Sequence, residues 1–463
     1  MLVEQLYTNC LAQASYYVES EGEAAIIDPL RDTDDYIQKA KERGVKIKYI
    51  FETHFHADFV SGHIDLAKKT GAEIIFGPGA DTSYAIHEAK DGEVFTLGKL
   101  AITVLHTPGH TLESSCYLLK DEEGKDYCLF SGDTLFVGDV GRPDLLDGKM
   151  SKEELASLMY DSLNSKIKPL ADDIILYPAH GPGSSCGKNL GPETYSTVGA
   201  QKENNYALQE MSREEFIAQV TEGITAPPSY FFDDARLNKT GYASLDAVIE
   251  KGNTALDLAT FEARRSEGIT VIDARIPDEF ELGFIPNAIN IGLNGQYAIW
   301  AGTLLPIHEP ILLVCPEGKE EEAVMRLARV GFDQIQGFLK GGFDTWKNSG
   351  NRMDMVISIT PEELALDFKH STIEVLDVRK PSEWDTCHLE GATHGSLQEL
   401  DKMIPNLNKG AQIYVHCAGG YRSMIAASML KAAGFSLVKN VYGGWSKIKE
   451  LDLPKVMPSK QSV

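Results

Sequence analysis

The stretch ETHFHADFVSGH, from Glu52 to His63, combines three histidines with an aspartate. Imidazole nitrogens and carboxylate oxygens are ligands for zinc and for redox-active metals such as iron. One His-x-His pair is weak evidence, but three later segments, TPGH, FSGD and YPAHG, also carry a possible ligand. Four such segments in order predict a metal site, with the number and kind of ions left open. The candidate ligands are His54, His56, Asp58, His110, Asp133 and His180.

A second reactive segment, VHCAGGYRSMIAASMLKAAGF, leads from a strand through Cys417 and a glycine-containing loop into a helix stopped by Gly434. Backbone N–H groups and a helix N-terminus would surround the sulfur with positive potential. We therefore expect a lowered pKa for the Cys417 thiol and a stabilised anion on its sulfur; an inert buried cysteine is the alternative. Arg422 would add a fixed positive charge for an anionic substrate. The other loop residues expected to bind substrate are Ala418, Gly419, Gly420, Tyr421 and Ser423.

The second half of the chain contains a duplication, because residues 269–291 are echoed by residues 373–395. Each copy alternates apolar strands with helices, which predicts a parallel sheet covered on both faces. The first copy keeps Cys315, but its loop is one residue shorter and KEEE replaces the Arg-Ser pair. Pro316 removes an N–H donor and the glutamates would repel an anion. We predict that Cys315 is not catalytic.

The first half of the chain alternates short apolar strands with helices, and several of its strands end in histidine, aspartate or glycine. This pattern predicts an α/β domain with its ligands at the strand ends, where such sheets place their sites. We predict three domains, covering residues 1–252, 253–353 and 354–463.

Composition excludes several classes of protein. The chain has 463 residues, with 44 Lys and Arg against 68 Asp and Glu, so its formal charge of -24 disfavours nucleic acid and anionic membranes as partners. Seven cysteines without a CxxC pair favour free thiols in a reducing compartment. No apolar run approaches the ~20 residues of a membrane span, and the N-terminus resembles no signal peptide. We expect a cytoplasmic protein and a homo-oligomer.

The segments THFHAD, TPGHT, SGDTLF and YPAHG, in this order, resemble the metallo-β-lactamase fold. The resemblance implies an αββα sandwich of two sheets flanked by helices, with metals at one edge. Dinuclear hydrolases of this family, such as glyoxalase II, have a histidine directly after the aspartate of the first motif. Phe59 occupies that position here, which counts against a two-zinc hydrolase.

The segments GDVGRPDLL and SSCGKNLG resemble persulfide dioxygenases fused to rhodanese domains, and C-x-x-G-x-R-S with VLDVR and YGGW resembles the rhodanese active-site loop. The resemblance covers essentially the whole chain. It implies one Fe(II) held by His54, His110 and Asp133, a thiol persulfide and O₂ as substrates, and sulfite as product. It also implies sulfur transfer at Cys417 that makes thiosulfate, with a degenerate middle rhodanese domain.

Under this interpretation, His56, Asp58 and His180 orient the ligands or tune the pocket, although His56 could instead bind the same metal. Arg142 is a possible counter-charge for the substrate, with a salt bridge to Asp144 as the alternative. Cys186 could line the pocket mouth or be a buried inert thiol.

Two other functions remain open. One is a zinc-dependent thioester hydrolase of glyoxalase II type with rhodanese modules. The other is a sulfur carrier or scaffold without enzymatic activity of its own. The sequence does not indicate which thiol carries the persulfide.

Overall fold

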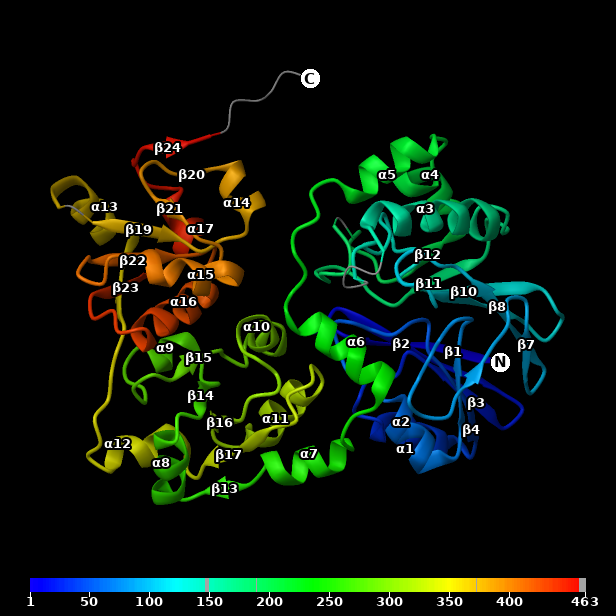
Figure 1. Cartoon of the computed structure of the whole chain (residues 1–463), viewed down its shortest axis with the longest axis horizontal. Helices are drawn as coiled ribbons and strands as arrows, with labels where there is room; N and C mark the ends of the chain where they lie inside the picture. Colours follow the sequence, from blue (N-terminus) through cyan, green and yellow to red (C-terminus); the bar gives the residue numbers. More distant parts are fainter. Residues whose placement is uncertain (146–149, 189, 372, 458–463) are drawn as a thin grey trace. The chain divides into compact units, whose positions relative to one another are not determined.

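The computed structural model describes residues 1–145, 150–188, 190–371 and 373–457. Leu146 of GDVGRPDLL and Asn189 of SSCGKNLG lie outside the described residues. The chain forms two compact units (Figure 1). Unit 1 contains Met1–Ala247 with Ala328–Phe332, and unit 2 contains Val248–Leu327 with Asp333–Val463. The three domains expected from the sequence, and the two boundaries between them, stay predictions.

Unit 1 is built on two six-stranded sheets. The first sheet has the strand order β1-β2-β3-β4-β5-β6 and the second β12-β11-β10-β9-β8-β7. The strands of the first sheet are β1 (Leu2–Thr8), β2 (Gln13–Ser20), β3 (Glu23–Ile27), β4 (Lys46–Phe51), β5 (Glu73–Phe76) and β6 (His87–Glu88). Those of the second are β7 (Val94–Leu97), β8 (Leu100–His106), β9 (Ser115–Lys120), β10 (Asp126–Gly132), β11 (Ile175–Pro178) and β12 (Ser196–Thr197).

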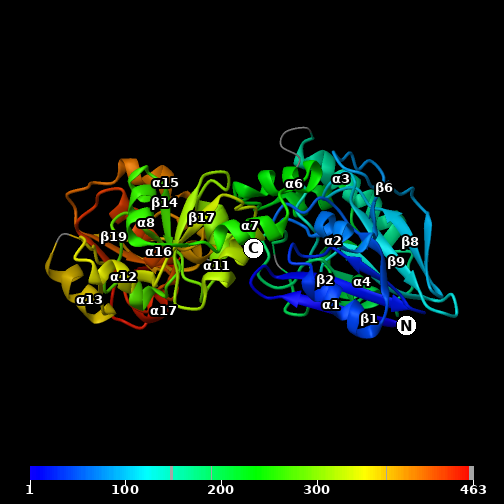
Figure 2. The same ribbon diagram turned by 90° about the horizontal axis from the view of Figure 1, so that it is seen from below.

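Three apolar layers hold unit 1 together. Aromatic residues such as Tyr16, Phe51 and Phe130 fill the space between the sheets. Tyr36 and Leu66 pack helices against the outer face of the first sheet, and a separate cluster packs helices against the second. The helices are α1 (Asp34–Arg43), α2 (His63–Thr70), α3 (Lys152–Ser162), α4 (Val198–Asn204), α5 (Arg213–Thr221) and α6 (Tyr230–Thr240). Figures 1 and 2 show α1 and α3 on opposite sides of the two sheets, so the αββα sandwich is confirmed.

Unit 2 contains two five-stranded parallel sheets of matching order, β13-β17-β16-β14-β15 and β18-β23-β22-β19-β21. The first is formed by β13 (Ala255–Leu256), β14 (Thr270–Asp273), β15 (Ile289–Asn290), β16 (Ile311–Val314) and β17 (Ile335–Leu339). The second is formed by β18 (Ile357–Ile359), β19 (Glu374–Asp377), β21 (Thr393–His394), β22 (Ile413–His416) and β23 (Val438–Val441). The predicted duplication and the predicted parallel sheets are thereby confirmed.

Helices connect the parallel strands, as right-handed crossovers require. Those before and within the first sheet are α7 (Leu245–Gly252), α8 (Leu258–Ser266), α9 (Pro277–Phe280), α10 (Tyr297–Leu304), α11 (Glu320–Ala328) and α12 (Gly342–Asn348). Those of the second are α13 (Pro361–His370), α14 (Pro381–Thr386), α15 (Leu400–Met403), α16 (Tyr421–Ala432) and α17 (Gly444–Ile448). The short strands β20 (His388–Leu389) and β24 (Lys455–Val456) pair with each other. Among the described helices, none combines the length and apolar character needed to traverse a bilayer.

Candidate metal centre and cysteine loop

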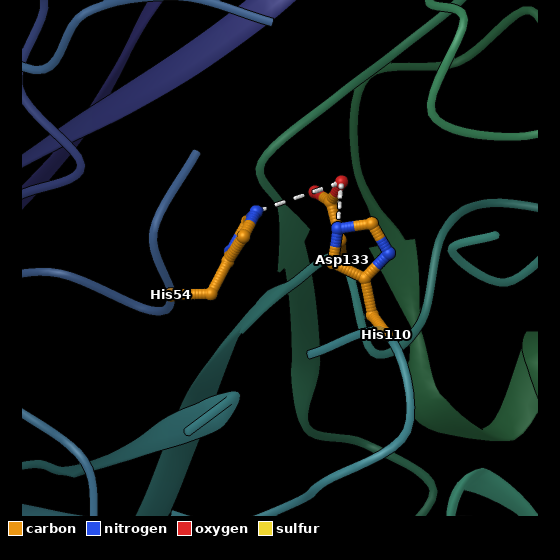
Figure 3. A group of neighbouring side chains, drawn as sticks. All are labelled: His54, His110 and Asp133. Atoms are coloured by element: carbon orange, nitrogen blue, oxygen red, sulfur yellow. Dashed lines mark ion pairs between the residues drawn. The ribbon is translucent and has the colours of Figure 1, made fainter. Parts of the chain in front are cut away.

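His54, His110 and Asp133 come together at the strand ends of unit 1 (Figure 3). They follow β4, β8 and β10 respectively, and all three are buried. Asp133 Oδ2 lies 3.4 Å from His110 Nε2 and 3.8 Å from His54 Nε2. The sequence prediction that these three side chains meet at one edge therefore agrees with the structure.

Thr53 and Asp28 fix the tautomer of His54 through hydrogen bonds on its Nδ1 side. The Thr53 hydroxyl donates to Asp28 Oδ2 at 2.9 Å, so its oxygen accepts the Nδ1 proton of His54, also at 2.9 Å. Burial lowers the pKa of His54 well below its ordinary value, and the neighbouring histidines lower it further. His54 is therefore neutral, with the lone pair of Nε2 facing Asp133.

His110 is fixed in the same way. Its Nδ1 lies 2.8 Å from the carbonyl oxygen of Arg142, which can only accept, so Nδ1 carries the proton and Nε2 the lone pair. Gly141 makes this approach possible, because a Cβ there would lie 2.2 Å from the Asp133 carbonyl oxygen and 2.8 Å from His110 Nδ1. Backbone carbonyls that orient a histidine in this way are typical of metal sites.

These three side chains fit a metal ion. His110 Nε2 and both carboxylate oxygens of Asp133 are buried, and no described residue forms a hydrogen bond with them. Two lone pairs facing a carboxylate would repel one another unless a cation lay between them. Ligands each about 2.0–2.2 Å from one ion are roughly 3.0–3.5 Å apart, close to the spacing observed here. The set can hold a divalent ion with coordination positions left open.

A second group lies beside the first and contains His56, Asp58 and His180. His180 Nε2 is 3.5 Å from Asp58 Oδ1 and 3.5 Å from Asp133 Oδ1. Burial raises the pKa of Asp58, and the nearby Asp133 raises it further. Asp133 therefore stands between the two groups and could be shared by two ions.

His56 faces away from the first group. Its Nε2 lies 3.2 Å from Asp28 Oδ1 and 3.6 Å from Glu52 Oε2. Burial alone would lower the pKa of His56, but the two carboxylates outweigh it and raise the pKa to about 9. The Phe59 ring packs against His56 at a centroid distance of 4.4 Å and is fully buried. An apolar ring thus fills the place where a further ligand was expected from the hydrolases.

Arg142 is already paired. Its Nε and Nη2 donate to the two oxygens of Asp144 at 2.6 and 2.8 Å, and Nη2 also donates to the carbonyl of Thr225 at 2.6 Å. The salt bridge that was the alternative for Arg142 is therefore present, and its role toward a substrate stays a prediction. Its backbone carbonyl, which fixes His110, was not anticipated.

Cys186 lies at the centre and not on its rim. It is buried, and its sulfur groups with Asp133 and His180 within the reach of one ion. Burial raises the pKa of its thiol well above the ordinary value, and Asp58 and Asp133 raise it further. A role in sulfur chemistry stays a prediction, because a neutral thiol is a poor nucleophile.

Two residues that hold the backbone of the histidine loop after β4 were not predicted from the sequence. Asp28 follows β3 with a φ of 50°, and its Oδ1 accepts from the Thr53 backbone N–H at 2.7 Å. Asn238 on α6 donates to the carbonyls of His56 and Phe59, both at 2.8 Å. Asp28 follows the apolar residues of EAAIIDP, and this position after a strand could have indicated a role in the site. Nothing in the local sequence indicates such a role for Asn238.

In unit 2, Cys417 follows β22 and precedes α16, as predicted. The N–H of Gly420, whose φ is 116°, donates to Cys417 Sγ at 3.1 Å. The carbonyl of Cys417 accepts from Trp445 N at 2.7 Å, which ties the loop to the turn after β23. A positive φ is costly for residues other than glycine, so Gly420 lets the loop curl around the sulfur.

Two loop side chains have partners that the sequence did not indicate. Arg422 forms a bidentate pair with Glu383, at 2.6 and 2.9 Å. Ser423 donates to Asn440 Oδ1 at 2.7 Å. The guanidinium predicted at Arg422 is therefore paired with a carboxylate of α14, and it also interacts with Cys417.

Cys315 sits at the corresponding place after β16, where α11 begins with three glutamates. Burial raises the pKa of its thiol, and the carboxylates of Glu320 and Asp273 raise it further. A neutral thiol is a poor nucleophile, and the expectation that Cys315 is not catalytic stays a prediction.

Residues 8–180 match the metallo-beta-lactamase superfamily, and residues 257–349 and 360–451 each match the rhodanese-like domain. The solved structure of a metallo-beta-lactamase from Staphylococcus aureus is 34% identical, covers 73% of this chain and 98% of its own, and has a TM-score of 0.65. A probable hydroxyacylglutathione hydrolase of Schizosaccharomyces pombe is 31% identical over 35% of this chain. A hydroxyacylglutathione hydrolase of Haemophilus influenzae is 28% identical over 42% of this chain and 91% of its own length.

The chain spans about 60% of the length of the Schizosaccharomyces pombe relative. The matches to these two hydrolases cover 35% and 42% of the chain, whereas the Staphylococcus aureus structure covers 73% of it. The chain belongs to the metallo-beta-lactamase superfamily and carries two rhodanese-like domains.

Proposed function

We propose that the protein is an Fe(II)-dependent persulfide dioxygenase coupled to a sulfurtransferase. The first reaction would be R–S–SH + O₂ + H₂O → R–SH + SO₃²⁻ + 2 H⁺, in which the sulfane sulfur is oxidised and O₂ is reduced. The second would be R–S–SH + SO₃²⁻ → R–SH + S₂O₃²⁻, by way of a persulfide on Cys417. Sulfite made by unit 1 would thus be consumed within the same chain.

The observation that carries the proposal is the set of His54, His110 and Asp133, with both Nε2 lone pairs facing the carboxylate. Two histidines and one carboxylate that leave open positions are typical of non-haem Fe(II) oxygenases. When bound, iron would supply redox chemistry toward O₂ and a sulfur substrate, which zinc lacks. The two rhodanese-like domains link the same chain to sulfane sulfur.

The chain's own residues prepare this site. Asp28 and Thr53 hold His54 in its neutral tautomer, and the Arg142 carbonyl does the same for His110. The buried Phe59 ring excludes water and a further ligand on the side of His56. In unit 2, the Gly420 N–H would stabilise negative charge on the Cys417 sulfur and on the sulfur that it receives.

A second candidate is a metal-dependent hydrolase of hydroxyacylglutathione thioesters, as the names of the relatives suggest. The grouping of His56, Asp58 and His180 beside Asp133 favours it, because two ions could be held. Phe59 disfavours it, since a hydrolase of this type has a histidine there.

One experiment separates the two candidates. The full chain is loaded with Fe(II) or with Zn(II), and metal content, O₂ uptake with glutathione persulfide and hydrolysis of a hydroxyacylglutathione are measured for each. We expect one iron per chain, sulfite plus thiosulfate as products, and one O₂ consumed for each sulfite formed, including the sulfite that is converted into thiosulfate. Asp133→Ala should lose both iron and O₂ uptake, whereas His87→Gln, outside the centre, should lose neither. Thioester hydrolysis by the zinc form without O₂ uptake by the iron form would replace the proposal with the hydrolase.

A further inference from the structure

The loop that carries Cys417 borders a pocket of about 310 Å³ that is also lined by the middle rhodanese-like domain. Gly419, Gly420 and Tyr421 line it from the last domain. Asp278 and Asn294, from the domain of Cys315, line it as well. A volume of this size lies at the low end for small-molecule sites and leaves room for an organic thiol beyond its sulfur.

The middle domain also fixes the wall next to Cys417. The Tyr421 hydroxyl donates to the carbonyl of Gly292 at 2.7 Å. A Cβ at Gly295 would lie 2.4 Å from the Tyr421 ring, so the backbone of the middle domain packs directly on this ring. Tyr421 begins α16 immediately after the Cys417 loop. The domain that lost its own reactive loop therefore shapes the pocket of the other.

The charge of this pocket comes from one side chain. Among the described residues that line it, Asp278 alone carries a formal charge. Asp278 is exposed on α9, and no described residue forms a hydrogen bond or an ion pair with its carboxylate. Arg422, which could have balanced it, is paired with Glu383. A ligand in the pocket thus meets a carboxylate that no cationic side chain of the described pocket lining balances.

We propose that the middle rhodanese-like domain forms the outer wall of the Cys417 pocket and that Asp278 selects a sulfur donor with an ammonium group over a doubly charged inorganic anion. The preferred donor class is an amino-acid thiol persulfide, whose ammonium group would face Asp278. The Cys417 thiolate attacks the outer sulfur of R–S–SH, the S–S bond of the donor breaks, and R–S⁻ leaves while the proton stays on the transferred sulfur. This inference rests on the proposed sulfurtransferase function of Cys417 and specifies its donor.

The charge selection can be tested without sulfur transfer. Aminoethyl methanethiosulfonate is a cation and sulfonatoethyl methanethiosulfonate an anion; both form a mixed disulfide with a thiolate and release methanesulfinate. The rate of labelling at Cys417 in the full chain is followed by peptide mass spectrometry. We expect the cation-to-anion rate ratio to fall about threefold in Asp278→Asn at low salt, the scale of one exposed charge pair. In 0.5 M salt, the rate ratios of Asp278→Asn and of the unmodified chain should become nearly equal.

Glu279→Gln is the matched control, because Glu279 is exposed on the same short helix but does not line the pocket. Its rate ratio should equal that of the unmodified chain. A ratio unchanged by Asp278→Asn, or changed equally by Glu279→Gln, would overturn the assignment to Asp278.

Sulfur transfer is measured in parallel, with cysteine persulfide and with thiosulfate as donors. We expect Asp278→Asn to lower kcat/KM for cysteine persulfide relative to thiosulfate by a similar factor. If the unmodified chain transfers sulfur from neither donor, the proposed sulfurtransferase function fails. The ratio of the labelling rates of the cationic and the anionic reagent at Cys417 would still show whether Asp278 sets the charge of the pocket.

Discussion

The two rhodanese-like domains share a scaffold and differ at one loop. Their sheets have the same strand order, and each has a buried ion pair two residues apart. Arg275 contacts Asp273 at 2.6 Å and lies over the Phe343 ring, while Arg379 contacts Asp377 at 2.6 Å and lies over the Trp445 ring. Around the cysteine, one loop offers an N–H to the sulfur, whereas the other carries Pro316 and three glutamates.

This difference separates what the fold needs from what the chemistry needs. Glutamates in the first turn of α11 suit the positive end of the helix dipole. Burial raises the pKa of the Cys315 thiol, Glu320 of this turn raises it further, and the three carboxylates would repel a bound anion. Helix α16 has no acidic residue in its first turn, so its N-terminus stays available to the sulfur. The two domains thus share a scaffold, but the cysteine loop is followed by three carboxylates in the middle domain and by none in the first turn of α16.

The largest effect should come from removing each cysteine in turn. Cys417→Ser should lower sulfurtransferase activity by at least about a thousandfold, because a nucleophile is lost. Cys315→Ala should leave it within about twofold. Thiosulfate formation from persulfide and sulfite is the measurement, with circular dichroism to show that both variants fold. Comparable losses in the two variants would mean that the middle domain also transfers sulfur.

The shared scaffold predicts equal costs in the two domains. Asp273→Asn and Asp377→Asn each leave a buried arginine without its partner, which costs about 3 kcal/mol of local stability. Hydrogen exchange of the amides in β16 and β22 would report each loss separately. Glu262→Gln breaks the more exposed pair with Arg265 and should cost less than about 1 kcal/mol. A loss in one domain only would show that the ion pairs are not equivalent.

The parts predicted from the sequence are those encoded locally. His54, His110 and Asp133 each follow an apolar strand, so their meeting at the strand ends follows from the fold. The Cys417 loop and the duplication were also readable, because strand, loop and helix follow one another in the chain. Local patterns determine such features almost completely.

The partners of these residues could not be predicted from local patterns. Asp28 reaches His54 through Thr53, and Asn238 reaches the histidine loop from far along the chain. Arg422 was expected to offer a free charge, but it pairs with Glu383, which the sequence did not single out; for Arg142 the pair with Asp144 had been named as the alternative. Asp278 enters the Cys417 pocket only because two domains pack together. Such contacts depend on tertiary packing, which spacing along the chain does not encode.

Cys315 also predicts a pH effect in the middle domain. Its thiol has a raised pKa when folded, whereas an unfolded thiol titrates near ~8.5. Unfolding above that pH therefore releases a proton, so the contribution of Cys315 to stability is complete below pH ~8.5 and falls as the pH rises.

The free energy of unfolding of the unmodified chain should approach that of Cys315→Ala by at most about 1.4 kcal/mol per pH unit above ~8.5. Urea denaturation at several pH values measures the difference. Val314→Ala truncates the same strand without removing an ionisable group, so its difference from the unmodified chain should not depend on pH. A Cys315→Ala difference that is equally constant would mean that the folded thiol titrates normally.

Unit 1 offers a similar comparison, because Phe59 stands where dinuclear hydrolases of the family have a histidine ligand. The backbone at Phe59 is held by Asn238, so a histidine there would take the place of the ring beside His56. Phe59→His should raise the zinc content from one to two ions per chain, because Asp58, His180 and Asp133 already lie together. Phe59→Leu, which adds no ligand, should stay at one. If the unmodified chain bound two zinc ions, Phe59 would not prevent binding of the second ion. The loss of a functional group would then be limited to the cysteine loop of the middle domain.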